Sequence, residues 1–269
     1  MSSTAPLPHY EVYAIRYATR PARRTDNFIG GDPHDGPMPM DYFVWLIRGD
    51  DREFVVDVGF GHEVAGKRDR KLQRTVAEGL ALMGVEVAKV KDVILTHMHY
   101  DHVGTFDTFA EAQFHLQDDE MAYATGRYMR HAHLNHPYEV DEVTGMVRLV
   151  YERRVTFHRG EAELAPGITV HRVGGHADGL QCVRVSTRRG WVVLASDVSH
   201  YYEHFEQRRL FATMFNLGDA LEGYDTLEQL ADSRRHIVPG HDPLVMERYP
   251  PASPELEGIV ARLDAEPTY

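Results

Sequence analysis

The segment that most constrains this chain is the string His97-Met98-His99-Tyr100-Asp101-His102, which follows an apolar run predicted to form a buried strand over residues 90–95. His97 and His99 are two residues apart, so in extended backbone their rings leave the same face and can bind one metal ion. Asp101 and His102 follow where the chain is expected to turn into a helix, so they can face a second position nearby. The string therefore predicts two metal sites at a strand end.

Three further ligand-type residues occur in a similar setting, at strand ends with turn residues nearby: His176 after Gly174-Gly175, Asp197 at the end of residues 191–196, and His241 after Pro239-Gly240. A histidine after a glycine turn is, by itself, more often an ordinary surface residue. The four fixed positions of His-x-His-x-Asp-His, however, would arise by chance in only about half a percent of chains with this composition. Together these residues favour a metal centre over a solvated, histidine-rich loop.

The apolar runs predict an α/β fold in which antiparallel strand pairs alternate with helices, a layered sandwich instead of a doubly wound parallel sheet. Helices are expected at residues 69–83, 225–235 and 254–264, with Gly84 capping the first. Strands are expected at residues 10–17, 42–47, 53–58, 90–95, 113–116, 168–173, 181–186, 191–195 and 236–238. The connection at residues 48–52 has the turn residues of a hairpin.

Composition narrows the classes of partner. The chain has 29 Lys and Arg against 41 Asp and Glu, a formal charge of −12, which argues against nucleic-acid binding. Its single cysteine, Cys182, can form neither an intramolecular disulfide nor a cysteine-based zinc cluster. The sequence shows no signal-peptide-like run and no stretch approaching about 18 apolar residues, so we expect a cytoplasmic protein that does not enter membranes.

The motif set resembles the metallo-β-lactamase superfamily, whose pattern is His-x-His-x-Asp-His, then a Gly-His turn, a bridging aspartate at a strand end and a final Gly-His. The match extends from about Tyr42 to about Tyr249. Within the superfamily the chain is most similar to the N-acyl-homoserine lactonases, the quorum-quenching branch, in residues 42–45, 57–59, 96–102 and 240–242. The resemblance implies a four-layer αββα sandwich. We expect a single domain over residues 1–269, with a lid insertion around residues 120–160.

The resemblance also implies a ligand set for two zinc ions, other divalent metals being possible. One ion would take His97, His99 and His176, the other Asp101, His102 and His241, with Asp197 bridging them. A hydroxide held between the ions would be the nucleophile, because bound zinc lowers the pKa of water to about 7. Asp101 would also move the proton to the leaving oxygen. Asp57 would orient a ligand histidine through its second ring nitrogen.

One position departs from the lactonase pattern. Those enzymes have a tyrosine three residues after the bridging aspartate, whose phenol donates a hydrogen bond to the substrate carbonyl oxygen. In this chain that position is His200, and tyrosines follow at 201 and 202. Either His200 or Tyr201 could supply the catalytic hydrogen bond, and the substrate preference depends on which one does.

The resulting hypothesis is a zinc-dependent hydrolase that opens a lactone ring, with a small-molecule lactone such as an N-acyl-homoserine lactone as its partner, acting as a monomer or homodimer. The alternatives are a thioesterase like glyoxalase II, a hydrolase of another lactone or cyclic amide, and a non-hydrolytic iron protein. A basic patch for glutathione would favour the thioesterase, and none is convincing in the sequence.

Two clusters of basic residues leave their roles open. Arg20, Arg23 and Arg24 could bind a carboxylate or phosphate, although a run of charges is usually solvated surface. The histidines at 131, 133 and 136 could provide a polar group from a lid, but a solvated loop is the simpler interpretation.

Overall fold

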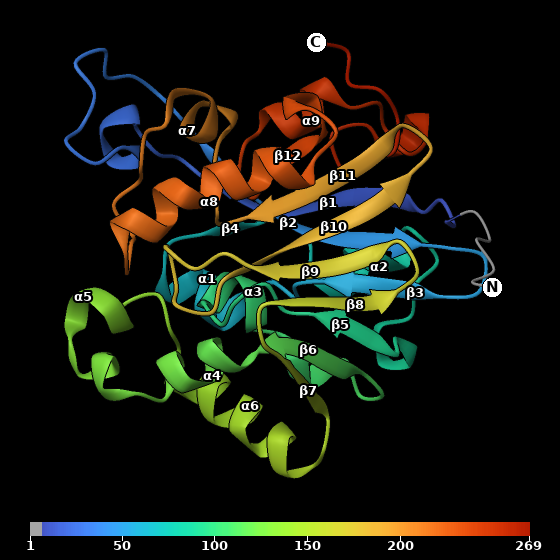
Figure 1. Ribbon diagram of the computed structural model, residues 1–269, viewed down its shortest axis with the longest axis horizontal. Helices are drawn as coiled ribbons and strands as arrows, with labels where there is room; N and C mark the ends of the chain where they lie inside the picture. Colours follow the sequence, from blue (N-terminus) through green and yellow to red (C-terminus); the bar gives the residue numbers. More distant parts are fainter. Residues whose placement is uncertain (1–6) are drawn as a thin grey trace.

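The computed structural model describes residues 7–269, whose strands form two mixed β-sheets with helices on the outer faces (Figure 1). The eight-stranded sheet has the order β13-β1-β2-β3-β5-β6-β7, with β4 paired to β1, and the five-stranded sheet has the order β12-β11-β10-β9-β8. This is the four-layer αββα sandwich expected from the sequence. One continuous set of buried apolar side chains, contributed by both sheets, fills the core.

The strands of the larger sheet are β1 (Glu11–Arg20), β2 (Met40–Arg48), β3 (Glu53–Val56), β4 (Lys71–Leu72), β5 (Asp92–Ile94), β6 (Gln113–Gln117), β7 (Val155–His158) and β13 (Val260–Arg262). Those of the smaller sheet are β8 (Glu161–Ala165), β9 (Ile168–Arg172), β10 (Gln181–Thr187), β11 (Gly190–Ser196) and β12 (Ile237–Pro239). Eight of the nine residues of β2 are buried, as expected for a strand covered on both faces.

The α-helices are α1 (His62–Lys67), α2 (Val76–Ala81), α3 (Tyr100–Val103), α4 (Asp118–Ala124), α5 (Ala132–Asn135), α6 (Val140–Tyr151), α7 (Tyr202–Gln207), α8 (Leu217–Leu230) and α9 (Leu244–Arg248). In Figure 1, α8 covers the outer side of the smaller sheet, whereas α4 and α6 lie on the opposite side of the molecule. No helix within residues 7–269 is both long and apolar enough to cross a bilayer.

Strand direction places the predicted site residues at one edge. In the larger sheet β3, β5, β6 and β7 are parallel, and in the smaller sheet β12 is parallel to β11. Because β9 and β11 are both antiparallel to β10, they run in the same direction. The carboxyl ends of β3, β5, β9, β11 and β12 lead directly into the segments that carry Asp57, the 97–102 string, His176, Asp197 and His241.

Three predicted helices differ from those observed. Residues 69–83 contain only the short α2, because Lys71 and Leu72 pair with the edge of β1 and the capping box between Thr75 and Glu78 begins the helix after them. The helix expected at 225–235 begins earlier, at Leu217, where the Asn216 side chain accepts hydrogen bonds from Gly218 N and Asp219 N.

The prediction of a helix at residues 254–264 was wrong. Residues Pro254–Leu256 form a single 3-10 turn, and the chain then becomes β13, which pairs antiparallel with β1 from Tyr13 to Ile15. The 3.6-residue spacing of apolar residues gave a helical pattern. Pairing with the exposed edge of β1 overrode that local preference, because an unpaired strand edge offers a row of backbone donors and acceptors.

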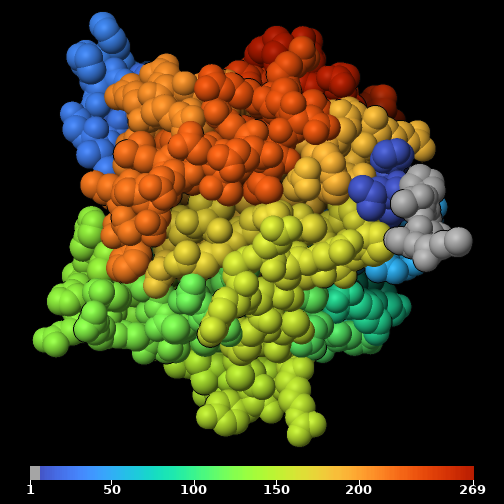
Figure 2. Space-filling view, in the orientation of Figure 1, coloured from blue at the N-terminus to red at the C-terminus, as the bar shows by residue number. Residues whose placement is uncertain are grey.

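The loop at residues 21–39 and the segment around α5 project from the same end of the molecule. Figure 2 shows them as the blue and green protrusions at the left of the view. Within the first loop a short 3-10 helix forms at Arg24–Asn27. Both segments therefore stand near the sheet edge where the predicted site residues collect.

We predict that Gly59→Ala destabilises the protein because the turn after β3 has no room for a side chain. Gly59 has φ +59°, and a Cβ there would lie 2.7 Å from Val76 Cγ2 and 2.8 Å from Tyr17 Cζ. The combined strain and overpacking should lower the free energy of unfolding by about 2 to 4 kcal/mol, measured by urea titration. Gly36→Ala is the control, since a Cβ there meets nothing within 4 Å. Equal stability of the two variants would contradict the prediction.

Candidate metal centre

The 97–102 string forms the turn between β5 and α3, as its spacing predicted. His97, His99 and His102 are buried, and Asp101 is 8% exposed. Nδ1 of His99 lies 3.0 Å from Nε2 of His97. Asp101 and His102 lie in the first turn of α3, where His102 Nε2 is 3.7 Å from Asp101 Oδ1. The string therefore presents two groups of donor atoms, as expected for two neighbouring ions.

The remaining predicted ligands lie next to these two groups of donor atoms. His176 Nε2 lies 2.8 Å from His99 Nδ1, and His241 Nε2 lies 3.8 Å from Asp101 Oδ2. Candidate ligand atoms within 4.8 Å of one another define the sets His97, His99 and His176; His97, His102 and Asp197; Asp101, His102 and His241; and His176, Asp197 and His200. All seven residues predicted as metal ligands thus lie in one connected cluster.

Asp197 stands between the two groups. Its Oδ1 is 3.1 Å from His241 Nε2 and 3.3 Å from His102 Nε2, whereas its Oδ2 is 3.2 Å from His176 Nε2. Burial alone would raise the pKa of Asp197, but the imidazoles of His241, His102 and His200 hold it well below its ordinary value. One ionised carboxylate therefore faces both groups, one oxygen to each.

The glycine before His241 allows this approach. A Cβ on Gly240 would lie 2.7 Å from the Ser196 carbonyl oxygen and 3.1 Å from Asp197 Oδ1. The turn after β12 can therefore pack directly against the end of β11 only because Gly240 has no side chain.

Asp57, which follows β3, anchors the 97–102 turn by hydrogen bonds. Its carboxylate accepts hydrogen bonds from Thr96 N at 2.7 Å, Thr96 Oγ1 at 2.8 Å and His102 Nδ1 at 2.7 Å. The last contact leaves Nε2 of His102 to face the cluster, which is how a carboxylate orients a metal-binding histidine. Asp57 thus has the contact that the sequence suggested.

Two other histidines are oriented by backbone carbonyls. His241 Nδ1 donates to the Asp41 carbonyl at 2.8 Å, and His176 Nδ1 donates to the Thr213 carbonyl at 2.5 Å. In the neutral ring each contact places the proton on Nδ1, so that Nε2 would be the atom left to bind a metal ion in the cluster.

Sequence reasoning missed Glu120, a fully buried carboxylate on α4. It accepts hydrogen bonds from Met98 N at 2.9 Å, Tyr138 Oη at 2.9 Å and Gly179 N at 3.1 Å. Met98 lies between His97 and His99, and Gly179 lies in the turn after His176. Glu120 therefore connects the segments that carry these three candidate ligands, and only three-dimensional contact reveals it.

The cluster fits a pair of metal ions. His102 Nε2 is buried without a hydrogen-bond partner among the described residues, although it faces the other ligands. Burial lowers the pKa of His97 and of His99 well below the ordinary value, so both imidazoles are neutral, the form that binds metal. Nitrogen and carboxylate oxygen donors without sulfur suit zinc and similar divalent ions. These buried clusters are consistent with a binuclear metal site.

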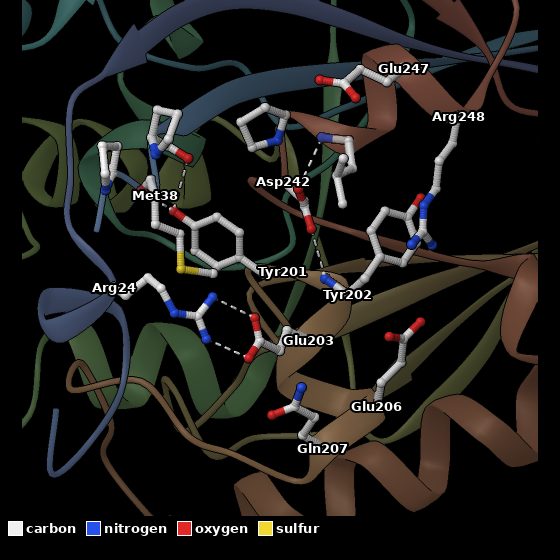
Figure 3. A pocket seen from close by; sticks show the side chains of 14 residues that line it. Arg24, Met38, Tyr201, Tyr202, Glu203, Glu206, Gln207, Asp242, Glu247 and Arg248 are labelled. Atoms are coloured by element: carbon white, nitrogen blue, oxygen red, sulfur yellow. Dashed lines mark hydrogen bonds and ion pairs between the residues drawn. The ribbon is translucent and has the colours of Figure 1, made fainter. Parts of the chain in front are cut away.

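His200 and Tyr201 point in different directions. His200 Nε2 lies 2.8 Å from Asp197 Oδ2, and its ring stacks on Phe211 with centroids 3.5 Å apart. The Tyr201 hydroxyl instead contacts Asn27 Nδ2 at 3.0 Å and the carbonyl oxygen of Pro39 at 3.2 Å. Figure 3 shows the Tyr201 side chain beside Met38, in a separate cavity of about 530 Å³. The structure therefore brings His200, but not Tyr201, to the cluster.

A cavity of about 130 Å³ opens above the candidate ligands. Three arginines lie in its wall, together with His136 from the loop after α5. The cavity is lined by Arg20, Met40, Tyr42, Arg68, Arg70, His99, Tyr100, Asp101, His136, Pro137, His176, Asp197, His200, Thr213 and His241. Of the two basic clusters noted in the sequence, each contributes one residue to this cavity, Arg20 and His136.

The sandwich fold and the buried cluster at its edge define the class of protein. The family model of the metallo-beta-lactamase superfamily matches residues 38–241, and the chain belongs to this superfamily of metal-dependent hydrolases. The superfamily expected from the sequence motifs is thereby confirmed.

Named relatives are distant. N-acyl homoserine lactonase AiiB of Agrobacterium fabrum is 30% identical over 176 residues, which cover 61% of this chain and 61% of that protein. The chain thus aligns with about three fifths of that relative. N-acyl homoserine lactonase of Bacillus cereus is 26% identical over 225 residues, 76% of this chain and 82% of that protein.

Solved structures share the fold. A quorum-quenching N-acyl homoserine lactone lactonase has a TM-score of 0.73 and 20% identity, over 88% of this chain and 93% of that chain. An N-acyl homoserine lactone hydrolase with the product N-hexanoyl-L-homoserine at its catalytic metal centre has a TM-score of 0.72 and 19% identity, over 88% and 94%. At these identities the likeness establishes the fold.

We predict that Asp57→Asn weakens metal binding about tenfold to a hundredfold, because the amide removes the charge that orients His102. The measurement is titration of metal-depleted protein against a chelator of known affinity. Asp51→Asn is the matched control, since the Asp51 side chain is 74% exposed on the β2–β3 hairpin. Unchanged metal affinity in Asp57→Asn would show that His102 needs no such orientation.

Proposed function

We propose that the chain opens a lactone ring, with N-acyl-homoserine lactones and related lactones as its candidate substrates and two zinc ions as its cofactor. The observation that carries this proposal is the sharing of Asp197 between two groups of buried imidazoles beneath a cavity. Its two carboxylate oxygens face different groups, as a bridge between two ions requires. The named relatives, which are homoserine lactonases at 26% and 30% identity, support the choice of bond.

The proposed ligands are His97, His99 and His176 for one ion, Asp101, His102 and His241 for the other, and Asp197 between them. Bound divalent ions would lower the pKa of water to about 7 and polarise the ester carbonyl. In our proposal Asp101 takes a proton from the attacking water and returns it to the leaving alkoxide. Its position in the cavity wall, 3.7 Å from His102 and 3.8 Å from His241, supports that role.

We propose that His200 donates a hydrogen bond to the substrate carbonyl oxygen, in the place where the lactonases have tyrosine. Burial holds the pKa of His200 well below its ordinary value, so the ring is neutral and carries a single N–H. That N–H faces Asp197 Oδ2 in this structure, and it would become free for the substrate if bound metal ions took up this carboxylate. Packing against Phe211 restricts the ring to one orientation. Both features suit a group that must be in place before the oxygen gains charge.

Residues 120–160, within the proposed single domain, are our candidate lid. They include α5 and α6, and the loop between these helices contributes His136 and Pro137 to the cavity wall. Tyr123 and Tyr128 belong to this segment, and their rings pack against each other and against Phe215, which would give such a lid an apolar inner surface.

A second candidate function is hydrolysis of a thioester such as a glutathione conjugate. The sequence showed no convincing basic patch, but the fold gathers Arg20, Arg68 and Arg70 in one cavity wall. The negative charges of glutathione would suit these guanidinium groups.

The deciding experiment is a proton-release assay on zinc-loaded protein with acyl-homoserine lactones of several chain lengths, simple lactones, a glutathione thioester and a penicillin. We expect turnover of lactones only. Turnover of the thioester alone would replace the proposal by the second candidate. Elemental analysis of the purified protein completes the test, since iron without zinc would contradict a zinc hydrolase.

We predict that His99→Ala and Asp101→Ala each reduce turnover of every hydrolysed substrate by at least about a thousandfold, since each removes a proposed metal ligand. The measurement is kcat on matched protein samples with metal content determined. His133→Ala is the control, because His133 is exposed on α5. Near-native turnover by either ligand variant would overturn the site assignment.

We predict that His200→Phe lowers kcat about a hundredfold or more, the typical cost of losing an oxyanion donor, while metal content is retained. Tyr201→Phe should change kcat less than about threefold, because its hydroxyl is bonded outside the cavity. The opposite ranking of the two variants would assign the donor role to Tyr201.

A further inference from the structure

The wall of the metal cavity contains positive charge that the proposed hydrolysis does not use. Arg20 lies at the end of β1 and Arg70 immediately before β4, and both line the cavity together with Asp101, His200 and His241. The same two arginines also line an adjoining cavity of about 580 Å³, whose wall includes Lys67 and Arg68. A molecule bound in the cavity above the candidate ligands therefore lies beside guanidinium groups.

Two of these four cations already have partners. Lys67 and Arg68 both pair with the carboxylate of Glu139, at 2.5 Å and 2.7 Å. The Arg68 guanidinium also lies over the Tyr100 ring, 4.0 Å from its centroid. These contacts explain Lys67 and Arg68 as part of the attachment between α1 and the segment before α6.

Arg20 and Arg70 have no carboxylate partner among residues 7–269. Arg70 donates to the Tyr100 hydroxyl at 3.0 Å and to the Arg68 carbonyl. Arg20 makes no side-chain hydrogen bond or ion pair within the described chain, and its Nε is buried. A buried donor without a partner is destabilising, so a ligand that accepts from it would be bound more tightly.

The backbone brings these two charges together. In the antiparallel pair of β1 and β4, Ala18 is opposite Leu72 and Thr19 is opposite Lys71. Arg20 and Arg70 are the next residues in these two segments, and both line the same two cavities. Like charges close together on neighbouring strands repel each other, and an anion bound between them would relieve that repulsion.

The carboxylates of the site do not neutralise the two arginines. Within residues 7–269, Asp57, Asp101 and Asp197 form ion pairs with histidines and none with Arg20 or Arg70. Two divalent ions would carry four positive charges, which these three carboxylates and the proposed hydroxide together would balance. The guanidinium groups are therefore available to a group on the bound molecule.

We propose that the substrate of this site carries a carboxylate, which Arg20 and Arg70 bind while the lactone carbonyl faces His200. That the substrate contains a lactone ring rests on the proposed function. That it carries a carboxylate rests on Arg20 and Arg70 alone. A simple N-acyl-homoserine lactone has no such charge, so this inference narrows the proposed substrates to the related lactones that carry a carboxylate. The small volume of the cavity, about 130 Å³, suits a single substituted ring.

The test uses two matched pairs of compounds and zinc-loaded protein. The first pair is γ-butyrolactone bearing a γ-carboxylate and its γ-carboxamide, compared by kcat/KM. The second pair is a cyclopentanone carboxylate and carboxamide, which have no bond to hydrolyse, compared by calorimetric affinity. We expect the carboxylate to be preferred at least about tenfold in both pairs, as for one charge-assisted hydrogen bond.

The variants Arg20→Gln and Arg70→Gln should each lose most of this preference, whereas Arg20→Lys and Arg70→Lys should keep part of it because they retain the charge. Arg159→Gln is the control: it makes the same change in net charge at a side chain that is 85% exposed. Circular dichroism and metal content verify that each variant is folded and loaded.

The outcomes separate the two proposals. Equal affinity for both ketones, or a preference that survives both glutamine variants, overturns the carboxylate subsite whether or not lactones are hydrolysed. An equal loss of turnover for both lactones in the arginine variants also overturns it. The arginines would then act on something that both lactones share, such as the carboxylate that ring opening releases. Carboxylate-selective ketone binding without lactone turnover would support the subsite and overturn the lactonase.

Discussion

The structure depends on one shared carboxylate. Asp197 faces imidazoles carried by both sheets, so its position requires the edges of the two sheets to meet at one point. The residue before it, Ser196, has φ +47°, which turns the chain sharply at the end of β11. Asp197 can therefore face His102 from the larger sheet and His241 from the smaller one. The contacts of Asp197 therefore fix two things together: how the edges of the two sheets lie relative to each other, and how the candidate ligands are arranged.

Two further buried carboxylates keep that geometry in the protein itself. Asp57 and Glu120 are each fully buried, and each accepts three hydrogen bonds. All three donors to Asp57 and two of the three to Glu120 lie in the segments that carry the candidate ligands; the third donor to Glu120 is the Tyr138 hydroxyl. A buried charge is costly unless several donors surround it, so each carboxylate favours the one arrangement in which its donors converge. The turn at 97–102 is thus held from two sides, by β3 through Asp57 and by α4 through Glu120.

Sequence alone predicted the parts of the site that are local. The alternation of His97 and His99, the turn before Asp101, and the glycine before His241 are short-range signals, and the structure brings these residues together. The sequence alone could not predict the role of Glu120. In the sequence it is one more charged residue of a helix, and only the packing of α4 against the Met98 segment gives it a role. The strand β13 was mistaken for a helix for the same reason: β1, the partner that decides its conformation, lies more than two hundred residues away. The choice between His200 and Tyr201 likewise depended on where the loop before β2 passes, since that loop captures the tyrosine hydroxyl.

An acidic protein with an arginine-lined cavity presents an apparent conflict, because a formal charge of −12 should repel an anion. The conflict is one of range. At physiological ionic strength, charges on the exposed surface are screened beyond about 8 Å, so most of the acidic excess does not act inside the cavity. Arg20 and Arg70 act at contact distance and partly out of water, where charge interactions are stronger. The net charge of the chain therefore indicates whether it attracts large polyanions such as nucleic acids. The charges inside the cavity indicate which small molecules can bind there.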